Sequence, residues 1–180
     1  TGISITQKGL DYLENYVKEV REEIGYEIPL AIDHMGHINE GSVIALARRL
    51  EKYNIAWIED VAPWMNTNIF KKISEHRAVS VVHPDVLTIG GAMEMKKLEE
   101  MCDQYGIAMA IHMAESPIAF MAAVHIAASM KNVMAIEFHS ADHPEWFRLV
   151  KGLPDPLIKD GYVRVPDAPG LGIEDINEAM

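Results

Sequence analysis

The fold is decided by the stretch Val81-Val-His-Pro-Asp-Val-Leu-Thr-Ile-Gly-Gly-Ala92. An apolar run from Ala78 to Val82 predicts a short strand, and the carboxylate of Asp85 follows its end. A glycine turn then leads into a helical pattern from Ala92 to Tyr105. A strand, a polar residue at its carboxyl end, a glycine turn and a helix form one βα unit of a parallel sheet or barrel.

A second unit follows directly, because Ile107 to Ile111 predicts a buried strand that ends in His112. The carboxyl ends of neighbouring parallel strands lie on the same face, so His112 and Asp85 are expected side by side. An aspartate that contacts a histidine fixes its tautomer and raises its basicity. Either residue alone would favour an ordinary loop residue, whereas the pair favours a functional site.

The rest of the chain repeats this alternation. Helices are expected at 6–24, 42–53, 68–74 and 118–130, and strands at 28–32, 55–58 and 133–136. Prolines and glycines past His139 indicate an extended C-terminal segment with a short strand pair around 162–165. We therefore expect residues 1–143 to form an α/β domain and residues 144–180 to pack back on it.

Polar side chains follow strand after strand. They are Asp33, Glu59, Asp85, His112 and Glu137. An open doubly wound sheet gathers its chemistry at one switch point, whereas a (β/α) barrel collects it from many strand ends, so the pattern favours a barrel. Five strands are visible and a barrel needs eight. The fold expected here is thus an incomplete (β/α) barrel.

Composition excludes several classes of protein. The net charge is −11 and 49% of the 180 residues are hydrophobic, which is typical of a soluble domain and unsuited to nucleic-acid binding. Cys102 is a lone cysteine in a helical pattern, so we expect a buried core thiol, no disulfides and a cytoplasmic location. No apolar run suits a membrane span or a secretory signal. The pair Glu99-Glu100 is expected on a solvated helix face.

Two carboxylates, Asp33 and Glu59, end consecutive strands. Converging carboxylates repel unless a cation lies between them, and Mg²⁺ prefers oxygen ligands. The alternative is a pair of solvated loop residues. A divalent ion beside a histidine base suggests removal of a proton next to a substrate carboxylate, with stabilisation of the resulting enediolate.

The ordered motifs resemble the enolase superfamily, in its mandelate racemase/muconate lactonizing branch. They are Ile32-Asp33, Trp57-Ile58-Glu59-Asp60, His83-Pro84-Asp85-Val86 with Gly90-Gly91, Ala110-Ile111-His112, Ile136-Glu137 and Val165-Pro166-Asp167-Ala168-Pro169-Gly170-Leu171-Gly172. Within that branch, the stretches Asp33-His-Met-Gly-His37, Glu59-Asp-Val-Ala-Pro-Trp64 and His139-Ser140 are most similar to acid-sugar dehydratases.

The resemblance implies a role for each strand-end residue. Asp33 and Glu59 match the first two metal ligands, His112 matches the general base with Asp85 as its partner, and Glu137 matches an acidic residue that hydrogen-bonds substrate or shares a proton. The acid that helps the β-hydroxyl leave would be His34 or His37. The family often places that histidine two residues after the first ligand, where this chain has Met35.

Some parts of the family pattern are missing. A third metal ligand, a glutamate on the strand after that of Glu59, has no counterpart, and its place falls between Glu75 and His76. The capping domain and first barrel strands are also absent. We expect that the chain, which opens at Thr1 without an initiator methionine, is a piece of something longer. The structure should show a gap or an incomplete barrel wall between Glu75 and His76.

The resemblance implies a Mg²⁺-dependent acid-sugar dehydratase that acts on a small sugar acid, and we also expect a homo-oligomer. Two alternatives stay open. One is a racemase or epimerase that uses the same base, and the other is a catalytically silent barrel that serves as a binding subunit. A second base on the opposite face would indicate the racemase, and loss of the third carboxylate would favour the silent barrel.

Overall fold

The computed structural model describes residues 2–33, 38–61, 65–139 and 143–177. His34, His37 and Trp64 lie outside the described residues. The helices are α1 Gln7–Ile24, α2 Glu40–Leu50, the 3-10 turn η1 Glu51–Tyr53, α3 Thr67–Glu75, α4 Ala92–Tyr105, α5 Pro117–Ala128 and α6 Pro144–Arg148. The strands are β1 Leu30–Asp33, β2 Ile55–Glu59, β3 Val81–Val82, β4 Ala108–Ile111, β5 Val133–Ile136, β6 Val150–Lys151, β7 Ile158–Lys159, β8 Tyr162–Val163 and β9 Asp175–Ile176.

The helices form where the sequence supplies caps. The Thr6 hydroxyl accepts a hydrogen bond from the Gly9 amide at the start of α1, and Gly25 ends that helix with a positive φ of 69°. The Asn39 side chain caps α2 in the same way, by accepting from the Ser42 amide. The helix therefore begins two residues before the expected Ser42, and its last turn tightens into η1.

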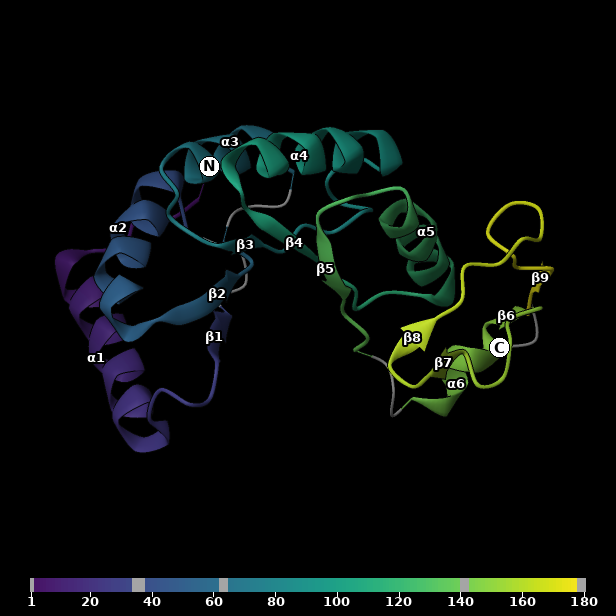
Figure 1. The fold of residues 1–180 in the computed structure, drawn as a ribbon, viewed down its shortest axis with the longest axis horizontal. Coiled ribbons are helices and arrows are strands. Elements are labelled where there is room, and N and C mark those ends of the chain that lie inside the picture. Colours follow the sequence, from purple (N-terminus) through teal and green to yellow (C-terminus); the bar gives the residue numbers. More distant parts are fainter. Residues whose placement is uncertain (1, 34–37, 62–64, 140–142, 178–180) are drawn as a thin grey trace.

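Strands β1 to β5 form an open arc of parallel pairs. Helices α1 to α5 cover the outside of this arc (Figure 1). β1 pairs with β2, and β3, β4 and β5 form a second sheet in that order. The buried core follows the arc from Leu10 and Leu46 to Phe120 and Trp146. This is an α/β barrel wall that does not close, as the strand count predicts.

The wall is interrupted between β2 and β3. These two strands belong to separate sheets and share no strand ladder among the described residues. The Ser80 hydroxyl, just before β3, donates to the Ala56 carbonyl of β2 at 2.7 Å. The backbone itself runs on from Glu75 to His76, and the His76 amide donates to the Lys72 carbonyl at the end of α3. The expected incomplete wall is therefore confirmed.

Strand β3 is shorter than the sequence predicts. The Ala78 amide donates to the Ile73 carbonyl at 3.0 Å, so this residue completes the end of α3. Arg77 has a left-handed φ of 47° in the same turn. Only Val81 and Val82 pair with β4. A valine-rich run predicts strand at each of its residues, but the bond to the end of α3 takes Ala78 out of the strand here.

Two expectations about α4 have opposite outcomes. Cys102 is fully buried, and burial raises the pKa of its thiol to about 11, so the predicted core thiol is confirmed. Glu99 is only 1% exposed, so the prediction of a solvated Glu99 is wrong. Its carboxylate accepts from the Lys131 and Asn132 amides and from the Lys96 ammonium, which makes burial tolerable.

The C-terminal segment packs against the α5 end of the arc. β7 and β8 form the predicted antiparallel pair, displaced slightly toward the N-terminus of the expected position. The Trp146 indole donates to the Glu115 carbonyl at 2.7 Å, and its ring contacts Phe120 and Phe138 edge-on. The division of the chain at residue 143 stays a prediction. Among the described residues, none of the helices has the length and apolar character needed to cross a membrane.

Candidate active site

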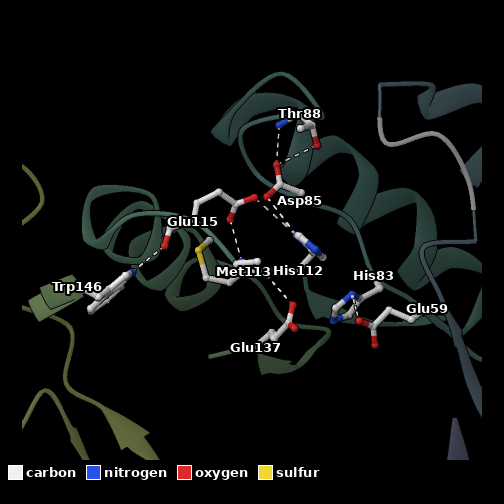
Figure 2. Close-up of polar contacts among 10 residues, drawn as sticks. Glu59, His83, Asp85, Thr88, His112, Met113, Glu115, Glu137 and Trp146 are labelled. Carbon is white, nitrogen blue, oxygen red and sulfur yellow. Dashed lines mark hydrogen bonds and ion pairs between the residues drawn. The ribbon is translucent and has the colours of Figure 1, made fainter. Parts of the chain in front are cut away.

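The strand ends gather the polar groups on one face of the arc (Figure 2). Asp33 and Glu59 are register partners on β1 and β2. Asp85 and His112 form an isolated parallel bridge just past β3 and β4. Glu137 follows β5, and its amide donates to the Ile111 carbonyl. All five described strand-end residues therefore lie where consecutive parallel strands predict.

Asp85 and His112 are in contact. Nδ1 of His112 lies 3.5 Å from Oδ2 of Asp85, at the long end of the hydrogen-bond range. The other carboxylate oxygen of Asp85 accepts from the Thr88 amide at 2.6 Å and from the Thr88 hydroxyl at 2.8 Å. The carboxylate is fully buried, and its orientation is fixed by these bonds. Asp85 is thus a rigid partner for the imidazole.

This contact shifts both pKa values. The bond to Asp85 raises the pKa of His112 to about 9, against the opposing effect of burial, and nearby Asp60, Glu137 and Glu115 add to the rise. For Asp85, burial alone would raise the pKa, but the bonds from His112 and Thr88 outweigh it and hold the pKa well below its usual range. In the metal-free protein the contact therefore favours the charged forms of both groups.

Glu115 adds a third group to this pair, which the sequence motifs did not predict. Its Oε1 lies 3.8 Å from Nδ1 of His112. Burial raises the pKa of Glu115, and the neighbouring Asp85 carboxylate raises it further. Glu115 lies in the loop between β4 and α5, three residues past His112. That i, i+3 spacing was the available signal, but a loop has no fixed side-chain direction.

The second cluster lies on the opposite side of His112 and contains Glu59, His83 and Glu137. One ligand atom from each residue lies within 4.8 Å of the others. His83 and His112 meet edge-on with ring centroids 5.7 Å apart, so the two clusters adjoin. His83 belongs to the opening stretch but was not among the expected site residues. His83 directly follows Val82, the last residue of β3.

Both glutamates of this cluster are oriented by donors. The Met113 amide donates to Oε2 of Glu137 at 2.9 Å. The Trp57 indole donates to Oε2 of Glu59 at 3.2 Å, since both side chains point to the same side of β2. Each carboxylate is therefore turned toward the strand ends. Oxygen ligands in such a cluster suit a divalent cation.

Comparison with known proteins identifies the family. The model of the family described as "Enolase C-terminal domain-like" matches residues 3–73 and 64–179. The chain belongs to this family. The match comes in two pieces that meet near α3, which is the region where the barrel wall is interrupted.

Curated relatives are sugar-acid dehydratases. D-xylonate dehydratase of Haloferax volcanii is 32% identical over 91% of this chain and 45% of its own length. D-galactonate dehydratase of Ralstonia pickettii is 27% identical over 99% of this chain and 54% of its own length. The chain therefore spans about half the length of the curated relatives it matches. The second alignment extends over 208 positions against 180 residues here, so the relative has internal residues without a counterpart.

Solved structures share the fold. A mandelate racemase/muconate lactonizing enzyme-like protein from Rubrobacter xylanophilus is 28% identical, with a TM-score of 0.68 over 98% of this chain and 50% of its own. An enolase from Pantoea ananatis, solved with d-gluconate and Mg, is 24% identical, with a TM-score of 0.69 over 99% of this chain and 48% of its own. The resemblance found in the sequence motifs is confirmed at the level of family and fold.

Proposed function

We propose that this chain carries the proton-abstracting half of a Mg²⁺-dependent sugar-acid dehydratase. The observation that carries the proposal is the contact between Asp85 and His112 beside the carboxylates of the strand ends. Curated relatives over nearly the whole chain are dehydratases of D-xylonate and D-galactonate, which are both aldonic acids. An aldonic acid is accordingly the substrate class.

His112 is the proposed general base. The neutral form of the ring is the one that would act as the base. Because Nδ1 faces Asp85, Nε2 is the nitrogen that would take the proton from the carbon next to the substrate carboxylate. Asp85 would hold the tautomer and stabilise the imidazolium that forms. The electron pair of the broken C–H bond then forms the carbon–carbon double bond, and the β-hydroxyl leaves as water. His34 or His37 stays the proposed acid for that departure.

Asp33 and Glu59 are the proposed magnesium ligands. They are register neighbours on β1 and β2, and a cation bound between them would offset the repulsion of two negative charges. Oxygen donors of this kind fit Mg²⁺, which would supply positive charge next to the substrate carboxylate. Glu137 would hydrogen-bond substrate, because its carboxylate is already oriented by the Met113 amide.

The proposal is tested by incubating the purified protein with Mg²⁺ and D-xylonate, D-gluconate or D-galactonate. Elimination followed by tautomerisation gives a 2-keto-3-deoxy acid, which mass spectrometry detects as a loss of one water. His112→Asn should reduce turnover by about 10² to 10⁴-fold. His76→Asn is the matched control, because His76 is exposed and lies at the C-terminal end of α3, before the start of β3.

The catalytically silent barrel is the second candidate. The observation that favours it is the interruption between β2 and β3, where the sequence resemblance places a third metal ligand. A silent chain would give no keto acid with any of the three sugar acids, and His112→Asn would change nothing. A racemase would instead return the epimer of its substrate without loss of water.

A further inference from the structure

His83 is a buried histidine with an unsatisfied ring nitrogen. It is 5% exposed, and Nδ1 has no hydrogen-bond partner within the described parts of the chain. Oε1 of Glu59 lies 3.6 Å from that nitrogen, which is too far for a hydrogen bond. A buried polar atom without a partner costs free energy and calls for an explanation.

The surroundings of this nitrogen have the composition of a metal site. Glu59, His83 and Glu137 come from the ends of β2, β3 and β5 and offer one nitrogen and two carboxylates within 4.8 Å of one another. Two ligands at about 2.0–2.2 Å from a tetrahedral ion are about 3.4 Å apart. The 3.6 Å between His83 and Glu59 is close to that value.

Hydrogen-bond donors orient the two glutamate ligands, as they do in protein metal centres. The Met113 amide and the Trp57 indole each occupy Oε2 of one glutamate and leave its Oε1 for another partner. Figure 2 shows the side chain of Glu59, at the end of β2, directed at the His83 ring just past β3. Donors behind the ligands fix carboxylate orientation in metal sites.

We propose that Glu59, His83 and Glu137 bind one divalent transition-metal ion, of the Zn²⁺ or Co²⁺ class. An imidazole ligand with two carboxylates suits these ions better than Mg²⁺, which prefers oxygen ligands only. The site shares Glu59 with the proposed magnesium pair, so a transition ion would compete with Mg²⁺. It would also join the two separate sheets across the interrupted wall. The site does not depend on dehydratase activity and would exist in a silent chain.

The test uses Co²⁺ alone as the probe, added to the chelator-treated full chain. We expect one Co²⁺ per chain, a visible d–d absorption band and displacement of that band by one equivalent of Zn²⁺. His83→Gln should weaken Zn²⁺ binding by at least about 100-fold, the upper end of what loss of an outer-shell partner costs. Parent-like affinity in a folded His83→Gln protein would overturn the proposal.

His125→Gln is the matched control. His125 also has a buried ring nitrogen that has no partner among the described residues, but it lies within α5. This variant should bind Co²⁺ like the parent, and equal losses in both histidine variants would refute a specific site. Asp33→Asn should weaken Mg²⁺ but leave Co²⁺ binding unchanged, which separates this inference from the proposed function.

A measurement on the parent protein covers the case in which His83→Gln does not fold. Zinc should shift the ¹⁵N resonance of His83 Nδ1 and leave that of His125 in place. A shift at His112 alone would assign the ion to the neighbouring cluster of Asp85, His112 and Glu115 and would overturn the proposal.

Discussion

At the scale of single residues, Asp85 controls the protonation of His112. The structure gives His112 a pKa of about 9, with the bond to Asp85 as the main cause. Asp85→Asn removes the negative charge and should return the His112 pKa toward its ordinary value near 6.5. NMR titration of the His112 ring in the metal-free protein measures this directly. An unchanged pKa in the variant would assign the rise to Asp60, Glu137 and Glu115 instead.

The same pair makes stability depend on pH. The raised pKa of His112 means that its contribution is complete below about 6.5 and is lost as pH rises through about 9. The lowered pKa of Asp85 means that its contribution is present above its ordinary value and is lost as pH falls. Thermal unfolding should therefore show the largest Tm difference between parent and Asp85→Asn from about pH 4 to 6.5. A difference independent of pH would contradict the ionic pair.

The position of a site residue can be predicted from the sequence where the backbone fixes the direction of its side chain. Asp33, Glu59 and His112 could be placed because each follows a parallel strand, and parallel strands end on one face. His83 and Glu115 could not. β3 stops at Val82, and Glu115 is held in a loop by its own contacts with His112 and the Ala114 amide, so strand periodicity predicts neither direction.

At the scale of elements, Glu99 ties α4 to the turn before β5. Its buried carboxylate accepts from the Lys131 and Asn132 amides. Glu99→Ala leaves two amides without their partner and should lower the free energy of unfolding by about 2–4 kcal/mol. Urea denaturation measures this, with the exposed neighbour Glu100→Ala as the control that should change it by under about 0.5 kcal/mol. Equal effects in both variants would contradict the anchoring role.

The burial of Glu99 was beyond sequence-based prediction. Two adjacent glutamates in a helical pattern are typical of a solvated face, and nothing local distinguishes Glu99 from Glu100. The difference arises because the end of α5 lies next to Glu99. The Lys96 ammonium donates both to the Glu99 carboxylate and to the Ser129 carbonyl at that end. A contact between residues some 30 positions apart along the chain decides it.

At the scale of the whole molecule, the two sheets should differ in local stability. β4 has a strand on both sides, whereas β2 is paired on one side only in the part of the chain that the structure describes. Amides of β4 should exchange with deuterium more slowly than those of β1 and β2, because they open only when the three-stranded sheet opens. Hydrogen exchange followed by mass spectrometry measures this. Equal protection would indicate that the arc behaves as one cooperative unit despite the interruption.

The central claim is that His112 removes the proton next to a substrate carboxylate. The most direct measurement is exchange of that proton in D₂O, with D-gluconate, D-xylonate or D-galactonate and Mg²⁺, followed by NMR. It reports the proton step even where elimination is blocked. The account predicts exchange by the parent and by His76→Asn, and a loss of about 10² to 10⁴-fold in His112→Asn. Exchange at the parent's rate in His112→Asn would contradict the claim and assign the base to another residue.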